Sequence, residues 1–458
     1  MLYLGASPTE ILWKGTKAPV FNRKQLCALL IPLMLEQILA SLMGMADTMM
    51  VSNVGSHAIA AVSLVDSLNI VMINLFSAMA TGGSIICSQY IGRDDLRQAN
   101  ETARQLLLSI TAISLVIGAV CLTLRRPLLS LIFGRVEDTV MENAEVYMLV
   151  TALSFPFLAM YNAGAALFRA SGNSRLPMTV SILSNIINII GNAILIFGLK
   201  MGVLGAAIPT LLGRVFCAVV ILYKLRQPHQ KIIVHDYRAI RPDFKRIGHI
   251  LRIGVPTGVE NSMFQFGKLV IQSTVSTLGT AAIAANAMAA MVEGFVGNAS
   301  VGVGLGLMTV VGQCMGAGHV EEARRYILKL SFLGRMLILL FCVMAAVLIE
   351  PVTVIAGMEP DAALMTVQMV WLRLQAPDVE HLLHAGLRHA RGWRRQVLAR
   401  HFLRHHVDMP RNHHRVAHPR VPYGSGRGVD RHVQRLDGAL DRLCMAFPQR
   451  PLGAASSH

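Results

Sequence analysis

The chain alternates between long apolar stretches and short polar connections. Each of the first nine stretches is long enough to cross a hydrocarbon core as a helix, which takes about 20 residues. The stretches are continuously apolar rather than alternating, so the pattern predicts helices and not barrel strands. The sequence therefore predicts an all-α polytopic membrane protein. The ten stretches cover residues 26–51, 58–88, 106–124, 146–168, 178–199, 203–223, 250–278, 281–311, 326–349 and 362–375.

The apolar pattern of the first half recurs in the second half at an offset of 224 residues. Duplicated helix bundles of this kind form many secondary transporters, with a central site between the two halves. The repeat predicts a two-lobe bundle of twelve helices, of which about ten are present. Matched pairs include Pro32 and Pro256, Glu36 and Glu260, Gln89 and Gln313, and Gly92 and Gly316. We expect an N-terminal six-helix lobe at 1–225, a cytoplasmic linker at 226–248, an incomplete C-terminal lobe of about four helices at 249–375, and a tail at 376–458.

Composition and charge fit a protein of the bacterial cytoplasmic membrane. The chain is 53% hydrophobic and 15% charged, which lies outside the usual range of soluble domains. Lys and Arg gather before the first stretch, after the second and fourth, and in the linker. Because positive residues favour the cytoplasmic side, we expect the N-terminus and the linker to be cytoplasmic. Residues 1–25 show no signal-peptide pattern.

The tail at 376–458 has a different composition, with fourteen Arg, no Lys and eleven of the sixteen His. A basic arm for nucleic acid or anionic lipid, or a His-based metal site, would explain parts of it. We favour another hypothesis, in which the tail is translated out of frame. The repeat predicts a second copy of the sequence 166–175 near residue 390. Residues 386–395 contain some of the same residue types but not in the same order. The transporter-like pattern stops near Gln375. We expect no nucleic-acid partner and no bound metal.

Charged residues inside the apolar stretches are candidates for function, because charge at membrane depth is costly. In the first stretch Glu36 and Asp47 lie eleven residues apart, close to three helical turns, so they share a face. Pro32 precedes Glu36 by one turn and can bend the helix. The repeat carries Glu36 to Glu260, whereas Asp47 corresponds to the apolar Ile271. The two halves therefore share a scaffold and differ in chemistry.

Further polar residues leave two interpretations open. Asn188 and Asn192 in the fifth stretch are an i, i+4 pair that either serves a neighbouring carboxylate or cation, or joins helices. Glu36, Asp66 and Glu293 lie either at functional positions or at helix ends. The seven cysteines show no paired spacing. No nucleophile–base pair or phosphate loop is present in the sequence, so we expect neither an enzyme nor a cofactor.

Together these residues resemble the multidrug and toxic compound extrusion (MATE) family. The resemblance covers roughly residues 20–375 and is specific in combination. It rests on Pro32 with Glu36, on 44–51, 89–92, 168–173, 185–192 and 202–207, and in the second half on Pro256 with Glu260 and on 312–318. It implies two six-helix lobes around a central cavity and export of organic cations by antiport with H⁺ or Na⁺. It also implies that Asp47 is the cation-coupling residue, with Asn188 and Asn192 around it and Glu260 in the second lobe.

The resemblance implies small-molecule substrates of the cationic drug class, contact with membrane lipid, and a monomer. Two other functions stay open. A lipid-linked sugar flippase of the same superfamily would line its cavity with several Arg or Lys, and the first nine stretches show no convincing set. An inactive product of a damaged transporter gene is the other alternative. The sequence does not identify the substrate or the coupling ion.

Overall fold

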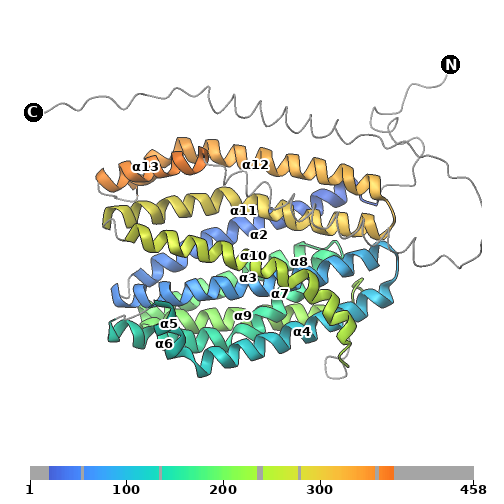
Figure 1. Cartoon of the computed structure of the whole chain (residues 1–458), viewed down its shortest axis with the longest axis horizontal. Helices are drawn as coiled ribbons and strands as arrows, with labels where there is room; N and C mark the ends of the chain where they lie inside the picture. The colour runs from blue at the N-terminus through green and yellow to red at the C-terminus, as the bar shows by residue number, and fades with distance from the viewer. Residues whose placement is uncertain are drawn as a thin grey trace, which may run out of the picture. The chain divides into compact units, whose positions relative to one another are not determined.

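The computed structural model describes residues 20–52, 56–133, 137–234, 241–276, 280–355 and 360–375. Within these ranges the regular structure is entirely helical, which confirms the all-α fold class (Figure 1). The helices are α2 (Arg23–Ser52), α3 (Ser56–Gly92), α4 (Leu96–Thr123), α5 (Arg125–Phe133), α6 (Asp138–Leu153), α7 (Phe155–Ala170), α8 (Arg175–Asn192) with its π-helical extension η1 (Ala193–Gly198), α9 (Val203–Leu225), α10 (Phe244–Ser276), α11 (Thr280–Gly316), α12 (Val320–Ile355) and α13 (Pro360–Gln375). The tail at 376–458 lies outside the described residues.

Each of the ten apolar stretches falls on helix, but they form twelve α-helices in the described part of the chain. The fourth stretch is divided into α6 and α7, which are bent by 44° at Ser154. The short α5 follows the third stretch. Among the described residues, seven helices are long and apolar enough to span a membrane, or eight if the bent pair counts as one span. Helix α10 is long but less apolar, since Glu260, Asn261 and Lys268 lie along it.

The internal repeat is visible in the positions of the helix ends. Helix α3 ends at Gly92 and α11 ends at Gly316, which is the same offset of 224 residues. The turns that follow are also equivalent, because Asp95 N–H donates to the Tyr90 carbonyl at 3.0 Å and His319 N–H donates to the Cys314 carbonyl at 2.8 Å. Both turns pass through a left-handed residue, as helix C-terminal caps commonly do. The duplicated sequence thus folds into a duplicated structure.

The two halves meet along a set of glycines that we call the seam, namely Gly82, Gly92, Gly254, Gly302 and Gly316. A Cβ atom at Gly92 would overlap the carbonyl oxygen of Gln313, and a Cβ at Gly316 would overlap that of Gln89, the repeat counterpart of Gln313. A Cβ at Gly82 would lie 2.8 Å from the Gly254 nitrogen. Backbone therefore packs directly on backbone, which only glycine allows.

The seam lies in the half of the bundle that ends at the two equivalent turns. Its glycines lie in the C-terminal halves of α3 and α11 and in the N-terminal part of α10, and Gly92 and Gly316 adjoin those turns. Glycines in the opposite parts of α2, α10 and α11 have open space around a built Cβ, as Gly44, Gly267 and Gly294 do. The halves are consequently in closest contact at the end that carries the turn 93–95 after α3.

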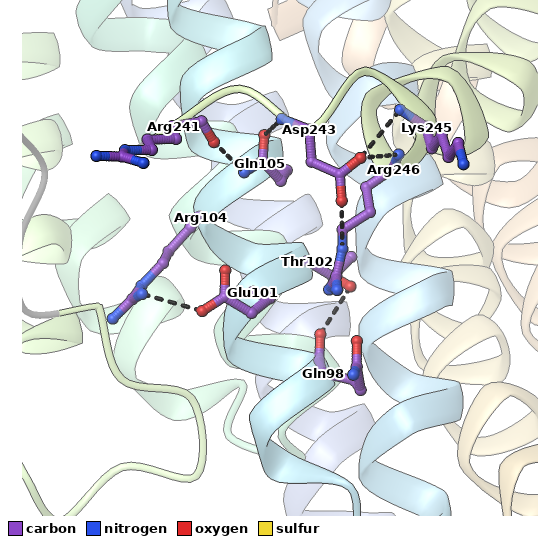
Figure 2. Close-up of polar contacts among 9 residues, drawn as sticks. All are labelled: Gln98, Glu101, Thr102, Arg104, Gln105, Arg241, Asp243, Lys245 and Arg246. Carbon is purple, nitrogen blue, oxygen red and sulfur yellow. Dashed lines mark hydrogen bonds and ion pairs between the residues drawn. The ribbon is translucent and has the colours of Figure 1, made fainter. Parts of the chain in front are cut away.

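The segment before α10 is bound to the first half through α4 (Figure 2). The buried Gln105 side chain donates to the Arg241 carbonyl at 2.8 Å and accepts from Asp243 N–H at 2.9 Å. Asp243 in turn caps α10, because its carboxylate accepts from the backbone N–H groups of Arg246 and Lys245 and from the Arg246 guanidinium. The backbone N–H of Arg246 is the main group that holds the pKa of Asp243 below its usual value. Helix α10 therefore starts from an anchor on the first half.

The close packing at the seam predicts that a Gly→Ala substitution lowers the stability of the protein at seam positions but not elsewhere. In Gly92→Ala the new methyl group meets the Gln313 backbone, so we expect a loss of about 1–3 kcal/mol in stability, the usual range for overpacking. Thermal unfolding of the purified protein in detergent measures it.

The matched control is Gly304→Ala, which lies on α11 where a Cβ meets nothing within 4 Å. We expect this variant to be neutral or slightly stabilised, since Ala favours helix over Gly by about 1 kcal/mol. Equal effects of the two substitutions would show that the seam is not tightly packed.

Candidate functional site

The two predicted asparagines lie together in the first half and are linked to α9. Asn192 donates its side-chain amide to Asn188 Oδ1 at 3.1 Å, and Asn188 donates to Thr210 Oγ1 at 3.1 Å. Thr210 donates to the Ala206 carbonyl at 3.0 Å. Asn188 and Asn192 are buried, so these bonds fix the amide orientations. The structure thus adds Thr210, which the sequence reasoning missed, to the predicted pair.

The helix that carries the asparagines changes its geometry immediately after them. Asn192 ends the α-helical part of α8, and residues 193–198 continue as the π-helix η1. The change coincides with close packing on α9, because a Cβ at Gly191 would lie 2.7 Å from Pro209 Cβ. Single π-helical turns are frequent at functional sites. The polar pair therefore lies where α8 is locally irregular and tightly held.

Glu36 lies in a buried ion pair rather than at a helix end. Its Oε1 is 3.6 Å from Arg169 Nη1 on α7, and the two side chains are only 8% and 12% exposed. Its second oxygen, Oε2, is buried without a hydrogen-bond partner among the described residues. Tyr161 lies beside Glu36 and donates its hydroxyl to the Pro177 carbonyl at 3.3 Å. The first half thus holds a compensated charge between α2 and α7.

Asp66 forms a second polar cluster that joins α3, α6 and α9. Its Oδ1 accepts from the Asn69 amide at 3.1 Å and from the Tyr147 hydroxyl at 3.2 Å. The Arg214 guanidinium on α9 lies near enough to interact electrostatically with Asp66, and it donates to Ser154 Oγ at 2.6 Å. Ser154 is the residue at which α6 and α7 bend. Hydrogen bonds from Asn69 and Tyr147 and the nearby Arg214 cation therefore converge on this carboxylate.

Arg214 was missed from the sequence, although one signal could have found it. It is the only charged residue in the apolar stretch 203–223, and it follows Thr210 by four residues, so the two share a face of α9. Thr210, which contacts the asparagine pair, and Arg214, which lies near Asp66, are therefore about one turn apart on α9. The two sets of polar side chains belong to one polar region of the first half.

The other predicted residues lie elsewhere. Glu293 on α11 forms a salt bridge of 2.7 Å with Lys268 on α10. Glu260 is exposed on α10, the first helix of the second repeat, which packs mainly on α3 and less on α11 and α4, so it is not part of the asparagine cluster on α8. Pro32 is buried within α2. Asp47 lies on α2, and its side chain is outside the described part of the structure.

Comparison with known proteins identifies the family. The sequence profile of the MatE family matches residues 32–194 and 256–378, which is more than half of the chain. The chain belongs to the MatE family. The protein is therefore a membrane transporter built from several apolar helices. The match confirms the MATE-family assignment that was based on the sequence motifs.

Similar proteins agree with this assignment. A probable multidrug resistance protein NorM from Thermotoga maritima is 28% identical over 353 residues, covering 74% of this chain and 73% of that protein. An uncharacterized transporter, YisQ, from Bacillus subtilis is 27% identical, covering 70% and 71%. A MOP superfamily transporter from Pyrococcus furiosus has the same fold, with a TM-score of 0.72 at 22% identity, covering 79% of this chain and 80% of that one.

The Asp66 cluster predicts that Arg214 stabilises the first half. In Arg214→Leu the charged hydrogen bond to Ser154 is lost and Asp66 loses its nearby cation, so we expect a loss of about 1.5–3 kcal/mol. Chemical unfolding of Arg214→Leu, Asp66→Asn and the double variant measures this, and the double variant should lose less than the sum because the residues are coupled.

Arg126→Leu is the matched control, since Arg126 also pairs with a carboxylate, that of Glu145, but its side chain is 72% exposed. An exposed pair contributes at most about 1 kcal/mol. If Arg214→Leu were no more destabilising than Arg126→Leu, the cluster would not stabilise the first half. If the Asp66 and Arg214 effects were strictly additive, the two residues would not be coupled.

Proposed function

We propose that this MatE-family transporter is a secondary active exporter of cationic small molecules, driven by antiport with H⁺ or Na⁺. The observation that carries the proposal is the hydrogen-bonded set of Asn188, Asn192 and Thr210 in the first half, where the family resemblance also expects the coupling carboxylate Asp47. The multidrug resistance protein among its relatives supports drug-like substrates.

The proposed coupling uses the charge of Asp47. Binding of H⁺ or Na⁺ removes the net charge of the carboxylate, after which α2 repacks around Pro32 and the drug is expelled. Pro32 suits this role because it removes one backbone hydrogen bond inside α2 and allows a second helix shape. Linkage requires that drug and coupling ion weaken each other's binding. Asn188 and Asn192 donate hydrogen bonds to the Asp47 carboxylate from their amide nitrogens, or coordinate the coupling ion through their amide oxygens.

The same assignment gives roles to Glu260 and to the seam. Glu260 is an exposed carboxylate of the second half and would attract cationic substrates or the coupling ion. If the turn after α3 and the linker are cytoplasmic, as expected for a bacterial cytoplasmic membrane protein, the seam closes the cytoplasmic end. We propose a monomer in which the cavity opens to the opposite side.

The buried arginines favour antiport over a sugar flippase. A flippase for lipid-linked anions needs cationic side chains that face the substrate. Arg169 is paired with Glu36, and Arg214 is bound to Ser154 beside Asp66, so both positive charges are engaged inside the first half.

We also propose that residues 376–458 are translated out of frame, so that the frame-restored protein is the active exporter and the 458-residue chain is not. The family match supports this. Carried over by 224 residues, the first match would end at residue 418, whereas the second match ends at 378. The counterparts of α7, α8 and α9, which form the polar region of the first half, would come from this part of the sequence.

Asp47→Asn tests the coupling mechanism in a frame-restored protein. The amide keeps the shape of the side chain but cannot exchange a proton or balance a cation, so we expect loss of coupled efflux with unchanged expression. Fluorescent drug efflux from cells measures it, with Glu101→Gln, which breaks a half-exposed pair with Arg104 within α4, as the control. Parent-level efflux in Asp47→Asn would refute the role of Asp47.

Restoring the reading frame after residue 375 tests the proposal for the tail. We expect the restored protein to be more abundant than the 458-residue chain and to confer drug resistance, because two missing helices would then cover exposed apolar surface. Immunoblots and growth in the presence of drug measure both. Equal resistance from the two proteins would mean that the tail has a role of its own, and stop codons in every other frame would exclude the frameshift directly.

A further inference from the structure

The seam depends on two surfaces of the first half that support α11. The first is α2, where the backbone of Leu33 and Met34 lies 2.9 Å from a Cβ built at Gly302. The second is the end of α7, where the Ala170 carbonyl accepts from the side chain of Gln313 at 2.7 Å. Because the first contact is steric and the second is directional, α11 fits only if α2 and the end of α7 keep a fixed spacing.

One ion pair joins these two surfaces directly. Glu36 follows Leu33 by three residues on α2, and Arg169 immediately precedes Ala170 on α7. A hydrogen bond of 2.6 Å from Ser174 Oγ to the Leu29 carbonyl is the neighbouring link between α2 and the segment after α7. The charged pair therefore joins α2 to α7 within one helical turn of the residues that contact α11 on each helix.

We infer that Glu36 and Arg169 form a latch that holds the seam closed. The pair sets the spacing between α2 and the end of α7, and α11 docks on both only at that spacing. Neutralising either charge leaves the other buried and uncompensated, which favours a rearrangement that brings it to water. Opening of the seam is such a rearrangement. The inference concerns the contact between the halves and is independent of the substrate and the coupling ion.

Ser88 is a suitable reporter of the closed seam. It is 1% exposed, and a Cβ at Gly312 on α11 would lie 2.7 Å from its own Cβ, so it lies between α3 and α11. Its hydroxyl has no hydrogen-bond partner among the described residues, so Ser88→Cys removes no bond of that kind. The adjacent Cys87 is replaced by Ala in the same protein to leave a single thiol at the reporter position.

The test compares the rate at which a small thiol reagent modifies residue 88 in the full chain, read by peptide mass spectrometry. We expect Glu36→Gln and Arg169→Gln each to speed modification by about tenfold or more. Loss of one partner of a buried pair destabilises the closed state, and the cost is large enough to change the ratio of open to closed protein by more than tenfold. The charge-reversed double variant, Glu36→Arg with Arg169→Glu, should return toward the parent rate. Glu101→Gln, which breaks the half-exposed pair with Arg104 within α4, should leave the rate unchanged.

The buried Cys121 on α4 separates opening of the seam from unfolding, because only unfolding exposes both thiols. Faster modification at residue 88 with an unchanged rate at Cys121 supports the latch. If a single variant exposes both, the charge-reversed double variant decides, and its failure to slow modification at residue 88 would overturn the proposal. Parent rates at residue 88 in both single variants would also overturn it.

Discussion

Direct backbone contact between the two halves is the constraint on which the rest of the structure depends. In a membrane, apolar side chains gain little by leaving lipid, so helices associate where small residues let their backbones approach. Gly92 against Gln313 and Gly316 against Gln89 are two copies of one contact, made twice because the sequence is duplicated. A side chain at either glycine would separate α3 from α11. The pseudo-symmetry of the fold is therefore also its means of closing one end.

The apolar stretches and the repeat could be predicted from sequence because both depend on local composition and on fixed spacing. The bend at Ser154 was not predicted, although Pro156 in the first turn of α7 is a local signal for a helix start. The bond from Arg214 to Ser154 could not be predicted, since Arg214 is sixty residues away on another helix. The asparagine pair followed from its i, i+4 spacing, whereas its partner Thr210 depends on how α8 packs against α9. Spacing predicts which residues share a face, and tertiary packing decides what that face meets.

Equivalent residues of the two halves serve different purposes, which explains how a symmetric scaffold carries an asymmetric chemistry. Glu36 is buried against Arg169, but its counterpart Glu260 is exposed. Asn74 donates to the Ile70 carbonyl within its own helix, whereas its counterpart Asn298 on α11 donates to Ser41 on α2 and so joins the halves. Sequence symmetry therefore identifies equivalent positions without assigning them equivalent functions.

The first helix of each half packs across the boundary. Helix α10 lies mainly against α3 and starts from residues that Gln105 holds on α4, while α2 lies against α11 as well as α8. A rocking motion of rigid halves would have to break these crossed contacts all at once. A smaller rearrangement is sufficient if α2 and α10 stay with the first half and α11 moves past them. The Glu36–Arg169 pair and the Gln105 anchor both favour that division, because each ties a crossing helix to the first half by polar bonds while the contacts with α11 rest mostly on glycine packing.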